Sequence, residues 1–422
     1  MQPISRWRIA GVITANAAVF YDFLIFALFA PQIGKAFFPA ESATSSLLSA
    51  LAAFGAAFAM RPIGAFVIGR FADRRGRVRA MQLNFQLMIF SMFAFAALPT
   101  HADVGVAASV IAVLLRLIQG FAIGGELGPS TAFLFETAPR QRRGFYTAFQ
   151  LASQNAAIVV AGLVGLLLAS VMSAAVLAQY GWRLAFVVGG LLLAIVYPLR
   201  RSLDTNIPSQ ANLSPQQTVT KPRFFILASV ILAQSSISIY VLLYMATYAT
   251  VTLQLPAQQS FIPTLAVGLT CLISCTLSGL LSDHVGRKPV MLAFTSILLV
   301  TALPTFQLVI ELGTISALII WCVFAATCVS AASTAAFVLI TESLPVRRRS
   351  LQLGLLYATV ASLLGGTTQF AIAWLIAITG QPAVPAIYMT GALLLGLGAM
   401  LLLPESWLRE PPTGAQGAES FD

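Results

Sequence analysis

The chain has 422 residues, of which 58% are hydrophobic and only 9% are charged. A soluble domain carries about 25% charged residues, so this composition excludes an ordinary soluble protein and indicates an integral membrane protein. The net charge of +10 raises nucleic-acid binding as an alternative, but the basic residues gather in alternate loops and tails, with little beyond Lys35 and Arg183 between them. This asymmetry follows the positive-inside rule, so we expect no nucleic acid and predict that both termini are cytoplasmic.

Apolar stretches recur along the chain, and each approaches the roughly 20 residues that a spanning helix needs. The segments of alternating hydrophobicity that a membrane β-barrel requires are absent from the sequence. We therefore predict an all-α integral membrane protein with twelve transmembrane helices. The predicted spans are residues 8–31, 45–70, 79–99, 104–137, 144–172, 181–200, 223–253, 261–283, 288–310, 314–342, 350–378 and 383–403.

A repeated loop motif divides the chain into two similar parts. The sequence GRFADRRGR begins at Gly69, and GLLSDHVGRK begins at Gly279, 210 positions later. A second pair, ETAPRQRR from Glu136 and ESLPVRRR from Glu342, is offset by 206 positions. Two pairs at nearly one spacing indicate an internal duplication, and hence two pseudo-symmetric six-helix bundles.

The division into two bundles predicts four segments along the chain. We predict a first bundle at residues 1–200, a cytoplasmic linker at 201–221, a second bundle at 222–404 and a cytoplasmic tail at 405–422. The linker is the longest polar connection, and the tail is rich in Gly, Pro and acidic residues, so we expect the tail to be disordered.

Four charged residues lie inside predicted spans, namely Asp22, Arg61, Arg116 and Glu126. An ionised group at the bilayer centre costs ~3 kcal/mol on insertion scales, so each one is expected to serve transport or to sit in a structural ion pair. The duplication places Cys271 opposite Arg61 and Cys322 opposite Arg116, and a scaffold charge would be expected in both copies. We therefore favour function, and keep the structural ion pair as the alternative.

Guanidinium groups facing a cavity of low dielectric constant suit bidentate recognition of carboxylates. Neutral donors can assist them, either from one polar face of the fifth span, at i, i+3 and i+4, or from tyrosines of the second half. A packing role for these hydroxyl and amide groups is an equal alternative. The predicted substrate-binding residues are Arg61, Arg116, Gln119, Gln150, Ser153, Gln154, Tyr240, Tyr244 and Tyr357. Asp22, Glu126 and Asn16 are predicted to couple the ion.

Catalytic patterns are missing from the sequence: it contains no G-x-S-x-G, H-E-x-x-H or Walker motif. The cysteines at 271, 275, 322 and 328 lie in apolar segments without His or acidic neighbours, so we expect packing roles and no metal site. The sequence therefore predicts neither an enzyme nor a cofactor.

The twelve spans and the repeated loop resemble the major facilitator superfamily over essentially the whole chain. Within it, Arg61-Pro62-Ile63-Gly64, the stretch from Leu115 to Glu126 and Gly181-Trp182-Arg183 resemble the metabolite:proton symporter family. FFPAES from Phe37 and GFYTAFQLASQ from Gly144 are similar to its citrate and tricarballylate branch. The first helix departs from the family, because Val19 stands where a glutamate is usual, between Asn16 and Asp22.

The resemblance implies a monomeric importer of a small carboxylate, with citrate or a related tricarboxylate as the first expectation. It implies alternating access in a bacterial inner membrane, driven by a proton, with sodium as the alternative ion. Another organic acid, such as a keto acid, a shikimate-like acid or aconitate, is the nearest alternative function. A drug exporter and a non-transporting receptor are more distant ones.

By the same resemblance, Asp73, Arg77, Glu136 and Arg140 form a network that latches the cytoplasmic side shut. Membrane orientation by the arginines is the alternative, although it leaves the repeated acidic residues unexplained. The full predicted gate set is Gly69, Asp73, Arg74, Gly76, Arg77, Glu136, Arg140, Asp283, Gly286, Arg287 and Glu342.

Overall fold

The computed structural model describes residues 6–75, 77–203, 222–345 and 349–403, nearly all of them helical. Helices suit a bilayer because they satisfy every backbone polar group within their own segment. Within the described residues, ten helices are long and apolar enough to cross a membrane. One bent helix pair can count as an eleventh span, and the shorter apolar helix Gln82–Ala97 lies where the third of the twelve predicted spans was placed.

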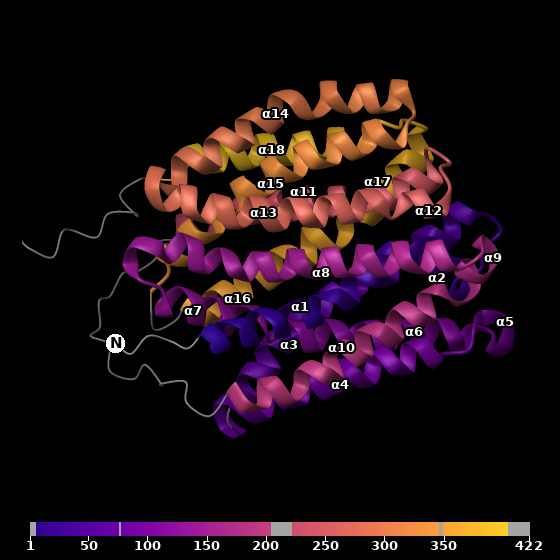
Figure 1. The fold of residues 1–422 in the computed structure, drawn as a ribbon, viewed down its shortest axis with the longest axis horizontal. Helices are drawn as coiled ribbons and strands as arrows, with labels where there is room; N and C mark the ends of the chain where they lie inside the picture. Colours follow the sequence, from indigo (N-terminus) through magenta and orange to yellow (C-terminus); the bar gives the residue numbers. More distant parts are fainter. Residues whose placement is uncertain (1–5, 76, 204–221, 346–348, 404–422) are drawn as a thin grey trace, which may run out of the picture.

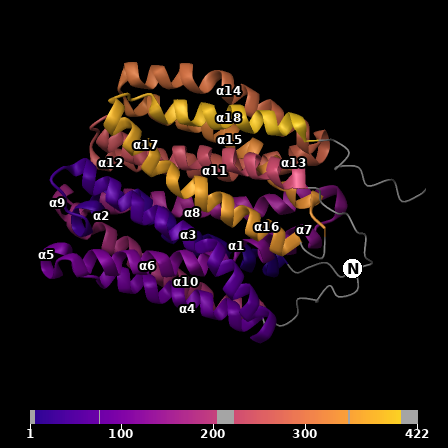
Figure 2. The same ribbon diagram turned by 180° about the vertical axis from the view of Figure 1, so that it is seen from behind.

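The helices form two bundles, drawn in indigo to magenta and in orange to yellow in Figure 1 and seen from behind in Figure 2. The first half contains α1 (Arg6–Leu28), α2 (Ala30–Phe37), α3 (Ala43–Arg75), α4 (Arg77–Ala97), α5 (His101–Val104), α6 (Val106–Gly124), α7 (Leu127–Thr137), the 3₁₀ turn η1 (Arg140–Arg142), α8 (Arg143–Val171), α9 (Ala174–Val176), the π-helical turn η2 (Leu177–Gly181) and α10 (Trp182–Leu203).

The second half contains α11 (Pro222–Val251), α12 (Ala257–Ser260), α13 (Ile262–Val285), α14 (Arg287–Leu312), α15 (Ile315–Ser343), α16 (Arg349–Val360), the π-helical turn η5 (Ala361–Gly365), α17 (Gly366–Thr379) and α18 (Val384–Leu402). The predicted linker from residue 204 onward and the predicted tail lie outside the described residues.

Two spans are interrupted where the sequence predicted continuous helices. The first span bends by 69° between α1 and α2. Pro31 lies in the first turn of α2, where the missing N–H and the proline ring favour such a bend. The fourth span divides into α6 and α7 at Gly125 and Glu126, so the predicted single helix over 104–137 is wrong.

The two halves touch near both ends of the molecule. At the end where α8 begins, which we call the motif end (left in Figure 1), Asp283 of α13 accepts hydrogen bonds from the backbone N–H groups of Gly144 and Phe145. At the opposite end, which we call the far end, the rings of Phe29 and Phe261 lie 5.4 Å apart, between centroids. The described part of the molecule is therefore closed at both ends.

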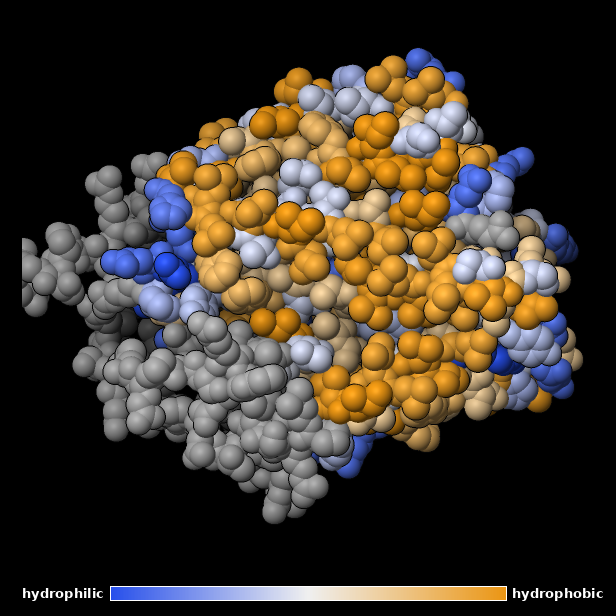
Figure 3. Space-filling model, viewed as in Figure 1, coloured by the Kyte–Doolittle hydropathy of each residue, from blue (hydrophilic) through white to orange (hydrophobic). Residues whose placement is uncertain are grey.

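The surface agrees with a membrane location. The face shown in Figure 3 is dominated by hydrophobic residues between the two ends, and its hydrophilic residues gather at the ends. Many large apolar side chains are exposed, such as Phe66, Leu167 and Val300. Exposed apolar patches of this extent indicate contact with lipid.

Candidate functional site

A small cavity lies between the two halves. Phe20 of α1, Arg61 of α3 and Leu127 of α7 line one side, and Tyr357 and Ala358 of α16 line the other. Its remaining lining residues are Ile123, Gly124 and Gly354. The cavity volume is about 10 Å³, which is the room that roughly one water molecule needs. In this closed conformation, the cavity-lining residues of the two halves therefore lie close together, and the space between them is too small for a substrate.

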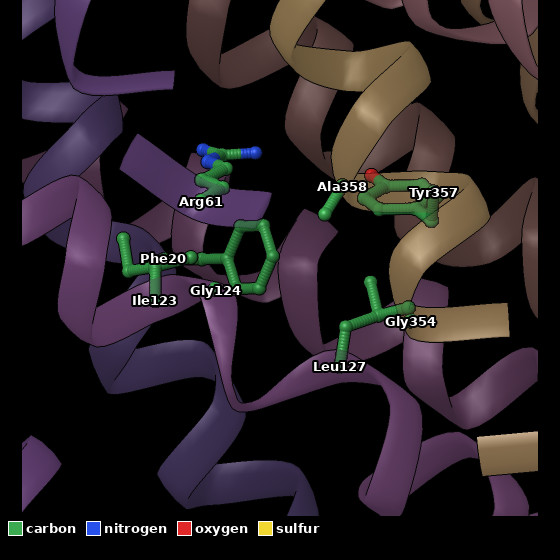
Figure 4. Close-up of a pocket in the computed structure, with 8 residues that line it drawn as sticks. All are labelled: Phe20, Arg61, Ile123, Gly124, Leu127, Gly354, Tyr357 and Ala358. Atoms are coloured by element: carbon green, nitrogen blue, oxygen red, sulfur yellow. The ribbon is translucent and has the colours of Figure 1, made fainter. Parts of the chain in front are cut away.

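Arg61 is the charged side chain that lines this cavity. Its side chain extends toward Tyr357 and Ala358 of the other half (Figure 4). The residue is only 3% exposed, and its Nε and one Nη have no hydrogen-bond partner. The guanidinium carbon lies 4.3 Å from the ring centre of Phe23 and 3.8 Å from that of Phe58. Such cation–π contacts hold the charge without neutralising it.

The unpaired nitrogens of Arg61 are donors that face a cavity between the halves. Within the described residues, Arg61 makes no salt bridge with any carboxylate. A planar fork of N–H donors matches the two oxygens of a carboxylate. Binding a carboxylate there would satisfy the unpaired nitrogens and the charge together.

Arg116 and Asp22 form an ion pair inside the first half. Arg116 Nη2 donates to Asp22 Oδ1 at 2.8 Å, and both side chains are completely buried. The rings of Phe26, Phe95 and Phe186 lie within 5.3 Å of the guanidinium carbon. Neither member of the pair lines the cavity. Arg116 therefore meets a carboxylate of the protein in this conformation, and its predicted contact with substrate stays a prediction.

Glu126 occupies the break between α6 and α7. It is 4% exposed, and it follows Gly124 and precedes Leu127, both of which line the cavity. The interrupted helix carries a buried carboxyl group close along the chain to the cavity wall. Its predicted coupling role stays a prediction.

The polar face of α8 is directed into the first half. Asn16 Nδ2 donates to Ser153 Oγ at 2.6 Å and to the backbone oxygen of Gln150 at 3.5 Å. Gln119 and Gln150 are buried, and both polar atoms of each side-chain amide lack a partner. Gln154 is half-buried, with its amide nitrogen unpartnered. None of these side chains lines the cavity in this closed state, so substrate contact would require the halves to open.

The three predicted tyrosines of the second half take different positions. Tyr357 lines the cavity. Tyr240 lies beside it, with its ring edge-on to Phe58 at 5.4 Å and its hydroxyl facing Arg61. Tyr244 is buried in the core of the second half, in the same cluster as Tyr248. The structure thus brings two of the three toward Arg61.

The gate residues of the second half form a connected group at the motif end. Arg287 lies 2.7 Å from Asp283 and 3.0 Å from Glu342, between charged atoms. Gly286 ends α13 with φ of 104°, a backbone conformation that glycine adopts at little cost. Because Asp283 also binds the first turn of α8, this group connects the two halves.

The predicted gate network of the first half stays a prediction, because most of its members lie outside the described residues. Glu136 pairs with Arg349 of the other half, at 3.5 Å. The surroundings of Gly69, the side chains of Asp73, Arg74, Arg77 and Arg140, and all of Gly76 lie outside what the structure describes. Arg349 was missing from the predicted gate set, although its place in the repeated RRR sequence marked it as a candidate.

The sequence reasoning also missed Phe23, Phe58 and Phe20, because nothing local distinguishes a phenylalanine beside a cation from one facing lipid. Within the described residues, no group of three or more His, Cys, Asp or Glu side chains could hold a metal ion. The four cysteines are buried and unpaired.

Two helical bundles in a membrane, with a charged cavity between them and contacts at both ends, are the arrangement of a membrane transporter. The chain matches the Major Facilitator Superfamily over residues 12–362, and it belongs to that family. Its fold is therefore the major facilitator fold of two six-helix bundles, and the protein is a transporter rather than an enzyme.

Individual relatives agree with the family assignment. The citrate-proton symporter of Salmonella typhi is 32% identical, over 94% of this chain and 93% of that protein. The alpha-ketoglutarate permease of Escherichia coli is 31% identical, over 86% of each chain. The structure of the proton:xylose symporter XylE superposes with a TM-score of 0.72 at 18% identity, over 94% of this chain and 95% of that one. The last comparison supports the fold alone.

Proposed function

We propose that this protein imports a small carboxylate, with citrate or a related tricarboxylate as its substrate, by proton symport. The observation that carries the proposal is the buried Arg61 guanidinium in the cavity between the halves, which has no carboxylate partner among the described residues. Tyr240 and Tyr357 supply neutral hydroxyl groups from the opposite half. An anion held between them would contact both halves at once.

The similarity to a citrate-proton symporter supports citrate, and the similarity to an alpha-ketoglutarate permease keeps a dicarboxylic keto acid as the second candidate. Both candidates carry a carboxylate that Arg61 can bind. Their difference lies in the remaining carboxyl groups, which would be recognised by groups exposed when the halves open.

The Asp22–Arg116 pair supports a route for proton coupling. In the low dielectric of the bundle, a proton on Asp22 would remove the charge that holds Arg116, and the freed guanidinium could then bind a substrate carboxylate. Glu126 is the second candidate carrier. Val19 provides no third carboxyl group between Asn16 and Asp22, so these two residues carry the proposed coupling.

Transport of a multiply charged anion requires accompanying cations. Each negative charge moved into a negative interior costs ~2.3 kcal/mol per 100 mV. Co-transported protons cancel this cost, and sodium is the alternative ion. The proposed orientation has both termini and the motif end in the cytoplasm of a bacterial cell, with the protein working as a monomer in the inner membrane.

The test is uptake of labelled citrate by purified protein in liposomes under an imposed pH gradient, sodium gradient or no gradient. The proposal expects saturable uptake that an inward proton gradient accelerates and unlabelled citrate blocks. Preferential uptake of labelled 2-oxoglutarate would favour the keto acid. Ligand binding without gradient-dependent flux would contradict symport.

A further inference from the structure

The middle of α3 contains a backbone carbonyl that its own helix cannot satisfy. In an α-helix the carbonyl of Phe58 would accept from the N–H of residue 62, but residue 62 is proline, which has no N–H. Phe58 is completely buried. A buried carbonyl without a partner is costly in a membrane, where neighbouring side chains must replace the lost hydrogen bond.

The replacement comes from the other half of the molecule. Ser362, in the π-helical turn η5, donates its hydroxyl to the Phe58 carbonyl oxygen. The same hydroxyl lies 2.6 Å from the carbonyl oxygen of Ala358 in its own helix. One hydroxyl proton serves one acceptor fully at a time. Ser362 can therefore bind across the interface or return to its own helix.

Phe58 is also the residue that holds Arg61. Its ring lies 3.8 Å from the Arg61 guanidinium carbon and packs edge-on against Tyr240. On the other side it fills the space next to Gly366, where an added Cβ would approach Phe58 Cγ to 2.6 Å. The backbone and the ring of Phe58 are thus both fixed by the second half, and Phe58 in turn covers the guanidinium.

We propose that Ser362 is a positioning residue for transport, which acts through the proline-exposed carbonyl of Phe58 to hold Arg61 in its binding position when the halves are closed. The inference rests on the proposed function for the role of Arg61, but the hydrogen bond and its effect on closure do not depend on the substrate. In the second half, the position aligned with Pro62 is Leu272. Leucine keeps its backbone N–H, so the second half has no equivalent carbonyl exposed by a proline.

The arrangement makes closure reversible at small cost. When the halves meet, the Ser362 hydroxyl satisfies Phe58. When they separate, the hydroxyl turns to Ala358, and water entering the open cavity can reach the Phe58 carbonyl. The closed state therefore gains one hydrogen bond that a variant without the hydroxyl lacks.

The test compares Ser362→Val with Ser362→Thr, which have nearly the same shape and differ in the hydroxyl group. In citrate uptake by liposomes, we expect Ser362→Val to raise KM about three- to tenfold relative to Ser362→Thr, the effect of one lost hydrogen bond. Thr367→Val is the matched control, since its hydroxyl bonds only within its own helix and faces outward. Equal KM values for Ser362→Val and Ser362→Thr would overturn the proposal.

A mutant cycle with Pro62→Ala tests the carbonyl itself. Alanine restores an N–H for Phe58, so Ser362→Val should change KM less than twofold in that background. An effect of unchanged size in the Pro62→Ala background would mean that Ser362 acts through something other than this carbonyl.

A substrate-free readout separates this inference from the proposed function. Spin labels at Ser45→Cys and Gln259→Cys, both exposed at the far end on opposite halves, report closure there. A second pair at Gln141→Cys and His284→Cys, both exposed at the motif end on opposite halves, reports closure at that end. We expect Ser362→Val, but not Ser362→Thr, to shift the label distances toward longer values. That shift without any carboxylate transport would refute the proposed function alone, and transport without the shift would refute the inference alone.

Discussion

At the scale of single residues, the central cavity depends on the contrast between two buried arginines. Arg116 pairs with Asp22 at 2.8 Å, whereas Arg61 makes no salt bridge among the described residues. Both guanidiniums lie against aromatic rings, and both keep two nitrogens without a hydrogen-bond partner. Both side chains are almost completely buried, so exposure does not separate them. The two arginines differ in whether a carboxylate of the protein pairs with them. We therefore expect substitutions of Arg61 and of the Asp22–Arg116 pair to have different effects.

Replacing Arg61 should impair binding of the anion. A hydrogen bond to a charged group contributes about 1.5–3 kcal/mol, so we expect Arg61→Gln to raise the citrate KM by roughly ten- to a hundredfold. Arg61→Lys should recover only part of the affinity, because an ammonium cannot bind a carboxylate bidentately. Citrate uptake kinetics measure the KM of both variants. Arg183→Lys is the control, because Arg183 lies at the far end and donates to the backbone oxygen of Leu98. Wild-type KM in Arg61→Gln would contradict the assignment.

Replacing Asp22 should affect stability and coupling together. Removing one member of a buried ion pair costs about 3–5 kcal/mol, because the other charge stays buried. Asp22→Asn should therefore unfold at lower temperature and lose citrate accumulation driven by a pH gradient, while exchange of citrate across the membrane persists.

The double variant Asp22→Asn with Arg116→Gln supplies the control for that experiment. It removes both charges, so we expect thermal stability to recover while proton-driven accumulation stays absent. Accumulation by Asp22→Asn at the wild-type level would exclude Asp22 as the proton carrier.

At the scale of helices, the duplication is visible in one seam of each half. In the first half, Gly124 of α6 lies so close to α3 that an added Cβ would be 2.0 Å from the backbone oxygen of Arg61. The aligned residues of the second half are Ser330 and Cys271, and there the Ser330 hydroxyl donates to the backbone oxygen of Cys271 at 3.0 Å. The equivalent pair of helices is thus joined by close backbone approach in the first half and by a side-chain hydrogen bond in the second half.

Gly120 in this seam tests how tight the first half is. A Cβ there would lie 1.7 Å from the backbone oxygen of Ala57, so Gly120→Ala must separate α3 from α6. We expect a loss of about 1–3 kcal/mol in stability, seen as a lower unfolding temperature in detergent. Gly398→Ala in α18 is the matched control, because no atom from another part of the described chain lies within 4 Å of its added Cβ. Equal stability of the two variants would contradict the contact.

At the scale of the whole molecule, contacts at both ends hold the halves closed around the cavity. At the motif end, Asp283 accepts hydrogen bonds from two backbone N–H groups of α8, at 2.8 and 2.9 Å, and so joins the two halves. A carboxylate at a helix N-terminus is stabilised by the exposed N–H groups and the helix dipole. This contact must break whenever the molecule opens at that end.

Asp283→Asn should therefore change the rate of transport more than the affinity for substrate. Asparagine keeps part of the hydrogen bonding but loses the charge that binds the helix end and Arg287, so we expect maximal uptake to fall severalfold while KM stays within about twofold. Asp103→Asn at the far end is the control, since within the described residues Asp103 accepts hydrogen bonds from Thr100 alone and none from the other half. Equal losses of maximal uptake and affinity would point to misfolding instead.

The sequence by itself determined the helical membrane fold, the number of spans, the two halves and the identity of the buried charges. These properties depend on local apolar length, on repeated motifs and on the cost of burying charge, all of which are visible within one segment. The break at Glu126 escaped the prediction, because the apolar stretch continues across it.

Only the tertiary structure decided which buried charge meets which partner. Asp22 and Arg116 are 94 positions apart, and Phe58 and Ser362 are 304 positions apart. Whether such residues meet depends on how each helix is rotated and where helices cross, and packing between whole helices sets both. For that reason the sequence could name Arg61 and Arg116 as equals, while in the folded molecule Arg116 pairs with a carboxylate and Arg61 forms no salt bridge within the described residues.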